Sequence, residues 1–139
     1  MRAPLYLAIL LATGLSGADP PRDVIEFFQD VTRALADAHT DDTTLPVSAA
    51  GFLEHFDPDM PGYAQLRENV EDLVSHTSVS SAVEFVTDEG DDNKRTLDLD
   101  WVLEIPDQRP RRQVLKCTIE RRGKKWKFTA LALVEFFKY

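Results

Sequence analysis

One segment constrains the fold more than any other, because apolar residues occupy every second position over nine residues. The apolar series is Leu97, Leu99, Trp101, Leu103 and Ile105. The residues between them are Asp98, Asp100, Val102 and Glu104. A period of two places alternate side chains on opposite faces of a strand. The segment therefore predicts a strand of an antiparallel sheet with one buried face.

Three further segments predict strands around this one. Residues 79–86 alternate in the same way, and residues 88–93 are typical of the hairpin turn that follows. Residues 114–121 predict a third strand and residues 126–137 a fourth. The fourth is apolar on both faces towards its end, as a central strand is. Four strands joined by short turns indicate an antiparallel meander.

The preceding part of the chain has helical periodicity. Apolar residues follow a spacing of three and four: Val24, Phe27, Phe28, Val31, Leu35 and Ala38. This stripe predicts a helix of about four turns. Asp23 and Glu26 have the spacing of a capping box at its start.

Two shorter helices are expected next. Ser48 can cap a short helix that carries Phe52, and Asp59 is a candidate N-cap for a third helix with Pro61 in its first turn. That helix is expected to end near His76. Three helices followed by four antiparallel strands indicate the α+β class.

Residues 1–18 have the parts of a secretion signal. Arg2 precedes a short apolar run at 5–12, and small residues stand at 16–18 before Asp19. The run is too short to span a bilayer. We expect cleavage after residue 18, which leaves residues 19–139 as a single domain in the periplasm or outside the cell.

The charge of the chain excludes several classes of partner. Its 16 basic and 24 acidic residues give a net charge of −8, which becomes −9 once Arg2 leaves with the signal. Such a chain is not expected to bind nucleic acid, or a membrane after signal cleavage. The single Cys117 excludes an intrachain disulfide and a cysteine-rich zinc site.

The charge is unevenly distributed along the sequence. Residues 19–107 hold 5 basic and 22 acidic residues, whereas residues 108–139 hold 10 basic and 2 acidic. The basic residues beside the third strand are Arg109, Arg111, Arg112, Arg121, Arg122, Lys124 and Lys125. They could form a surface for an acidic partner, or they could compensate the neighbouring acidic strand.

The chain resembles the nuclear transport factor two-like superfamily, also called SnoaL-like, as an exported member. The resemblance lies in the element order, in Phe27-Phe28 on the opening helix, and in residues 52–59. It also lies in residues 126–128 following the turn at 122–124. It implies a cone-shaped roll, with three helices packed on a curved four-stranded sheet.

The resemblance also implies where a ligand would bind. A small apolar ligand would lie between the opening helix and the sheet, in a pocket formed by Phe27, Phe28, Val31, Tyr63 and Trp101. Members of the superfamily commonly form homodimers through the sheet. Ketosteroid-isomerase-like members use a Tyr on the opening helix as an oxyanion donor. This chain has Phe27 and Phe28 there, a departure that removes the most recognisable catalytic partner of that activity.

Asp98 and Asp100 are the candidate catalytic carboxylates, because both project from one face of a strand. If that face lines the pocket, one carboxyl can act as a general acid or base, as in some SnoaL-like enzymes. If it faces solvent, Lys116 and Lys127 on neighbouring strands can pair with both.

His55 is a third candidate, since it lies near Asp57 and Asp59 in a predicted turn. It could be a general base or a metal ligand, or it could be exposed while the two acids shape the turn. The three histidines lack ligand spacing, so we expect no metal site, and nothing indicates a cofactor. Tyr63 could direct its hydroxyl into the pocket or belong to the core.

Two functional hypotheses follow. The first is a non-catalytic exported domain that binds a small apolar ligand or assembles with itself or a partner. The second is a small-molecule isomerase, dehydratase or cyclase that uses Asp98 or Asp100 as its acid or base. The sequence favours the first, because a fold resemblance by itself implies no particular chemistry. The second requires one of these carboxylates to point into the pocket.

Overall fold

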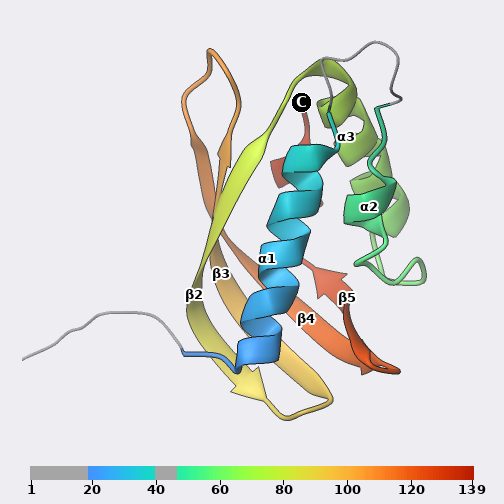
Figure 1. Cartoon of the computed structure of the whole chain (residues 1–139), viewed down its shortest axis with the longest axis vertical. Helices are drawn as coiled ribbons and strands as arrows, with labels where there is room; N and C mark the ends of the chain where they lie inside the picture. Colours follow the sequence, from blue (N-terminus) through green and yellow to red (C-terminus); the bar gives the residue numbers. More distant parts are fainter. Residues whose placement is uncertain (1–18, 40–46) are drawn as a thin grey trace, which may run out of the picture.

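The structure, a computed structural model, describes residues 19–39 and 47–139. The expected signal at residues 1–18 lies outside the described residues. Three α-helices precede a four-stranded antiparallel sheet, so the predicted α+β class is confirmed (Figure 1). Within the described ranges, no helix combines the length and apolar character that crossing a membrane requires.

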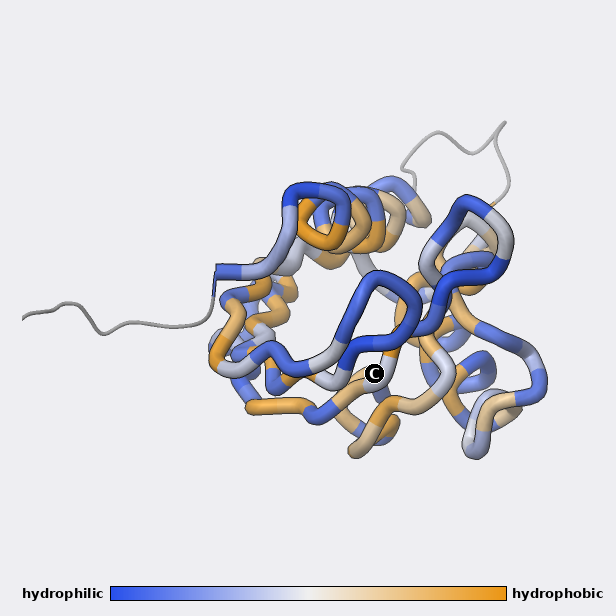
Figure 2. The backbone as a smooth tube through the Cα atoms, turned by 90° about the horizontal axis from the view of Figure 1, so that it is seen from below, coloured by the Kyte–Doolittle hydropathy of each residue, from blue (hydrophilic) through white to orange (hydrophobic). Residues whose placement is uncertain are grey.

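Helix α1 spans Arg22–Asp37 and buries the predicted apolar stripe. In Figure 2 the apolar positions of this helix face the interior and its polar positions face outward. The expected capping box is wrong, because Pro21 is the N-cap residue and no side chain caps the helix. The carboxylate of Asp23 binds Arg121 and Trp126 instead.

Helices α2 (Ala50–Leu53) and α3 (Tyr63–His76) follow. Ser48 is not the cap expected for α2, because Ala49 is the N-cap residue, although Ser48 Oγ accepts a hydrogen bond from the Ala50 N–H just before the helix. Asp59 is not the N-cap of α3, because that position belongs to Gly62, whose φ of 80° turns the chain into the helix. Pro61 therefore lies before α3 rather than in its first turn.

The four strands pair in chain order, each antiparallel to the next. They are β2 (Ser80–Gly90), β3 (Lys94–Glu104), β4 (Arg111–Arg122) and β5 (Lys125–Leu131). The first hairpin turn is shorter than expected, because β2 extends to Gly90. On β3 the predicted alternation is confirmed, since the residues from Leu97 to Leu103 at every second position are fully buried.

The prediction for the last strand is wrong in two respects. Strand β5 ends at Leu131, and Val134–Phe137 forms the 3₁₀ helix η1. Leu133, at a φ of 62°, turns the chain out of the sheet, so Phe137 packs against the core from a helix. Strand β5 is also an edge strand rather than a central one. Among residues 19–39 and 47–139, only an isolated bridge between Phe56 and Phe128 extends the sheet beyond it.

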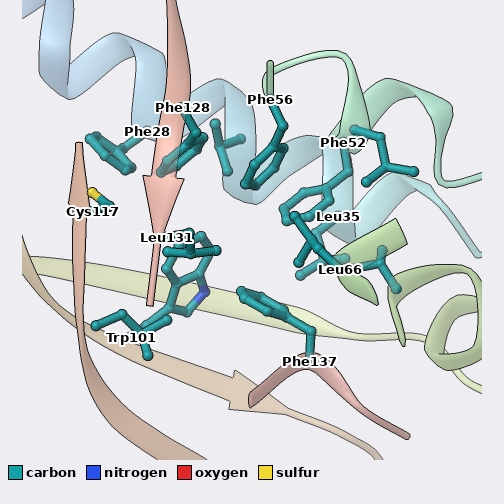
Figure 3. Close-up of a cluster of buried hydrophobic side chains, with 14 of the residues drawn as sticks. Phe28, Leu35, Phe52, Phe56, Leu66, Trp101, Cys117, Phe128, Leu131 and Phe137 are labelled. Carbon is teal, nitrogen blue, oxygen red and sulfur yellow. The ribbon is translucent and has the colours of Figure 1, made fainter. Parts of the chain in front are cut away.

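The core fills the space between the sheet and the helices. Figure 3 shows Phe28, Phe128, Phe56 and Phe52 in a row between these layers. Their neighbouring ring centroids are 5.5, 4.4 and 5.1 Å apart in that order. Aromatic rings at these separations make close contact, so the row acts as packed core.

Candidate functional site

Asp98 and Asp100 lie on the outer face of the sheet, opposite the helices, because their neighbours on β3 form the buried face. Asp98 lies 3.2 Å from Lys116 Nζ and accepts a hydrogen bond from Thr87 Oγ1 at 2.8 Å. These two partners, the Thr87 hydroxyl first, lower the pKa of Asp98. Asp100 accepts two hydrogen bonds of 3.0 Å from Arg112, through Nε and Nη2.

The expected pairing of Lys116 with an acid on β3 is confirmed, whereas that of Lys127 is wrong. Lys127 belongs to β5, which lies two strands away from β3, and it donates to the backbone oxygen of Glu54. The partner of Asp100 is Arg112, which lies on β4 directly across from Val102 of β3. Neither carboxylate points towards the helices, so the condition set for acid–base catalysis is not met by these two residues.

His55 and Asp57 lie in the turn between α2 and α3. The His55 ring is half-buried against Phe27, with centroids 5.6 Å apart, and this burial lowers its pKa. Asp57 shapes the turn by accepting the Asp59 N–H at 2.8 Å, a bond that lowers the pKa of its carboxyl, and it also pairs with Arg122. The turn role of Asp57 is therefore confirmed, whereas His55 is less exposed than expected. In the described ranges, no three acidic, His or Cys side chains could hold a metal ion.

The five residues expected to form one pocket do not surround one cavity. Phe28, Val31 and Trp101 are buried in the packed core, where the Phe28 ring lies 5.3 Å from that of Phe85. Phe27 and Tyr63 reach two separate grooves on the helix side of the molecule. The aromatic rings themselves therefore occupy the space in which an enclosed ligand was expected.

Two core residues, Trp101 and Cys117, carry a polar or titratable group that is buried. The Nε1 of Trp101 has no hydrogen-bond acceptor among the described residues, although the side chain is fully buried beside Phe137. Cys117 lies on the buried face of β4, and burial raises the pKa of its thiol. A buried thiol that stays protonated is a poor nucleophile. Cys117 therefore acts as packing, as the sequence indicates.

The larger groove, the α2–α3 groove, has a volume of about 740 Å³. Its lining includes Leu53, Phe56, Tyr63, Arg67, Arg122 and Lys127. Three of these supply apolar surface and three are cations, and the same lining holds the acids Glu54, Asp57, Asp59 and Glu71. Arg122 and Lys127 are engaged with Asp57 and Glu54, whereas Arg67 is exposed and forms no ion pair with the described residues. The sequence does not single out Arg67, because one basic residue on an exposed helix face has no distinguishing pattern.

The second groove, the α1–β5 groove, has a volume of about 600 Å³ and runs along the side of α1. Its lining includes Glu26, Phe27, Asp30, His55, Lys125 and Trp126. Within this lining, Asp23 Oδ2 accepts hydrogen bonds from Arg121 Nη2, at 2.7 Å, and from Trp126 Nε1, at 3.1 Å. Arg121 also lies 4.4 Å above the Trp126 ring.

Most of the basic residues beside β4 have partners within the chain. The two ends of this strand lie at opposite ends of the sheet, so the seven residues form two groups rather than one surface. Arg111 donates to the backbone oxygens of Phe136 and Lys138, and Arg112, Arg121 and Arg122 bind acids. This arrangement favours compensation within the molecule over a surface for an acidic partner.

Comparison with known proteins gives likeness at the level of the fold. No protein-family model matches the sequence, and no curated protein matches it. Among solved structures, Bd1075 of Bdellovibrio bacteriovorus is similar over 79% of this chain, with a TM-score of 0.62 and 13% identity. The chain spans only 38% of the length of that protein.

Two shorter proteins are similar over most of their own length. A protein of unknown function with a cystatin-like fold, from Nostoc punctiforme, has a TM-score of 0.53 and 12% identity, covering 78% of this chain and 85% of its own. A candidate aromatic ring hydroxylase from Novosphingobium aromaticivorans has a TM-score of 0.51 and 13% identity, covering 84% and 94%. These likenesses fit a nuclear transport factor two-like fold in its coarse outline.

Proposed function

We propose that this chain is a non-catalytic binding domain whose α2–α3 groove holds a small ligand with an apolar body. The observation that carries this proposal is the groove's apolar lining beside Arg67, a cation with no ion-pair partner in the described residues. Leu53 and Phe56 line the groove with side chains that are mostly buried in the core. The half-buried Tyr63 supplies a ring that a ligand can contact. Sites of this kind combine an apolar lining with a few polar groups that orient the ligand.

Two finer expectations belong to the same proposal. The first is a cone-shaped roll, in which the row of phenylalanines takes the place of an enclosed ligand and leaves binding to the open groove. The second is export, with cleavage after residue 18 and a mature chain in the periplasm or outside the cell. Amino-terminal sequencing of the exported protein should begin at Asp19. A mature chain that retains Met1 would contradict export by cleavage.

Fluorescence titration with 1-anilinonaphthalene-8-sulfonate tests the groove, because this probe pairs an aromatic body with an anionic sulfonate. We expect Tyr63→Ala to weaken binding about fivefold or more, since an aromatic contact contributes about 1 kcal/mol beyond area burial. Arg67→Ala should weaken binding and reduce its dependence on salt concentration.

Tyr139→Ala and Arg109→Ala are the matched controls, because both remove the same kind of side chain from exposed positions that do not line the groove. Thermal unfolding of each variant shows whether the fold is retained. Equal binding by Tyr63→Ala and Tyr139→Ala would contradict the proposal.

Self-association through the outer face of the sheet is a second candidate function. Val86 and Val114 are exposed on this face, at 44% and 50%, and in the described structure no helix covers it (Figure 1). The enzyme alternative is not proposed, because Asp98 and Asp100 are already engaged in ion pairs on that face.

A further inference from the structure

The α1–β5 groove has walls of opposite charge. On the α1 side its charged lining residues are Asp23, Glu26, Asp30 and Asp37, with Arg33 as the one cation of that wall. On the β4–β5 side they are Arg121, Lys124, Lys125 and Lys127. A site with one anionic and one cationic wall is complementary to a ligand that carries both charges on opposite sides.

Part of each wall is free to bind. Lys124 and Lys125 are exposed and form no ion pair with the described residues, whereas Arg121 is held by Asp23. On α1, Glu26 and Asp30 are exposed and pair only with other exposed side chains of their own helix. Such pairs contribute little stability, so a ligand cation can displace them.

The floor of the groove includes an open edge of the sheet. Phe128 turns its backbone groups outward, because its N–H donates to His55 O at 2.9 Å and its C=O accepts from Asp57 N at 2.8 Å. Backbone direction alternates along a strand, so Trp126, two residues earlier, also turns its N–H and C=O away from β4. The segment around His55 covers the edge at Phe128, and the groove lies beside the edge at Trp126, near the start of β5.

From these observations we infer that the α1–β5 groove binds an extended peptide segment in which basic and acidic side chains alternate. The peptide adds to the edge of β5 at Trp126. Its inward side chains meet the acids of α1, and its outward side chains meet Lys125 and Lys127 on the outer side of the sheet. This goes beyond the proposed function, since it concerns a different groove and a different class of ligand.

The length of the groove sets the length of the peptide. The helix from Asp23 to Asp37 rises about 21 Å, at about 1.5 Å per residue. An extended chain of about six residues, at about 3.3 Å each, covers that distance. Alternate side chains of such a chain point to opposite faces, which is why alternating charge, rather than total charge, fits the two walls.

The test uses two fluorescein-labelled hexapeptides of identical composition. In one, lysine and glutamate alternate; in the other, three lysines precede three glutamates. Fluorescence anisotropy with the full chain should show at least about tenfold tighter binding of the alternating peptide, because several cross-strand charge pairs form at once only when charges of opposite sign alternate. A third peptide, alternating but N-methylated at alternate backbone amides, should bind weakly because it cannot pair with the edge.

Charge reversal in the protein locates the site. Lys125→Glu and Glu26→Lys should each weaken binding of the alternating peptide about two- to fivefold, in the range expected for exposed charge pairs. Lys138→Glu and Glu68→Lys are the matched controls, because they make the same charge changes at exposed positions outside the groove. Thermal unfolding of all four variants checks that each retains its fold.

Three results would overturn the inference. Equal binding of the alternating and the block peptide would show non-specific attraction between charges. Tighter binding of an all-glutamate hexapeptide would show that the basic hairpin alone attracts acidic chains. Full binding by the N-methylated peptide would show that the edge of β5 takes no part.

Discussion

At the scale of single residues, Phe128 connects three elements that meet in the core. Its ring stacks on Phe56 at 4.4 Å and 12°, and it also contacts Phe27 and Phe28 from α1. It therefore joins strand β5, the turn after α2 and the opening helix in one cluster. A residue with partners on three elements cannot be truncated without leaving a cavity between them.

We predict that Phe128→Ala lowers the free energy of unfolding by about 3–5 kcal/mol, the range typical of Phe→Ala in a packed core. Denaturant titration followed by circular dichroism measures this change. Phe85→Ala is the matched control, because Phe85 is only partly buried and contacts the same cluster through Phe28. A smaller loss at Phe128 than at Phe85 would contradict the central role of Phe128.

Asp23 makes the folding stability of the molecule depend on pH. Hydrogen bonds from Arg121 and Trp126 lower the pKa of its carboxyl below the ordinary aspartate value. Because the folded state favours the ionised form, this contribution is present at neutral pH. It is lost as the pH falls through the lowered pKa.

We predict that Asp23→Asn destabilises the protein by about 0.5–1 kcal/mol at pH 7, as for an exposed ion pair, and by less at pH 3. Urea unfolding at the two pH values measures the difference. Asp37→Asn is the control, because Asp37 is exposed on the same helix and forms no hydrogen bond or ion pair with the described residues. An effect of Asp23→Asn that is independent of pH would contradict the assignment.

At the scale of elements, turns are decided by backbone conformation more than by side-chain contacts. Gly123 joins β4 to β5 at a φ of 68°, in open space. Gly51 lies in α2, also in open space but without a positive φ. The two glycines differ only in what the backbone requires of them, so they separate conformational strain from packing.

We predict opposite signs for the same substitution at these two positions. Gly123→Ala should destabilise by about 1 kcal/mol, because an L-residue is disfavoured in the left-handed region. Gly51→Ala should stabilise by up to about 1 kcal/mol, because alanine is the better helix former. Thermal unfolding of both variants measures the two effects, and effects of equal sign would contradict this account.

At the scale of the whole molecule, the sheet separates two environments. Helices and aromatic rings cover its inner face, while its outer face carries ion pairs together with exposed Val86 and Val114. An antiparallel sheet can leave one face to solvent, so the outer face does not require a partner. The exposed valines nevertheless make it the candidate surface for a homodimer.

If the outer face forms a dimer, sedimentation velocity at micromolar concentration should show a dimer that Val114→Lys converts to a monomer. The substitution would replace an exposed apolar side chain by a charged one directly across from Asp100, and charged side chains are depleted at the cores of interfaces. Leu133→Lys is the matched control, since Leu133 is similarly exposed but lies outside the sheet. A wild-type chain that sediments as a monomer at every concentration would contradict the homodimer.

The sequence by itself determined the α+β class, the buried face of β3 and the apolar stripe of α1. Periodicity carries this information because it depends only on neighbouring residues. It also indicated that Cys117 is buried and that Lys116 can pair with Asp98. It failed where the chain changes direction: Leu133, in a conformation rare for leucine, converted the expected end of the last strand into η1.

Only the tertiary structure decided which distant groups meet. Asp23 and Arg121 are 98 residues apart, and no local pattern distinguishes their contact from a helix cap at Asp23. The same limit applies to the five expected pocket residues, because whether side chains line a cavity or fill it depends on how the layers pack. Here the phenylalanines of α1, β5 and the turn after α2 fill the interior. The remaining grooves therefore lie at the surface, between elements that are distant in the sequence.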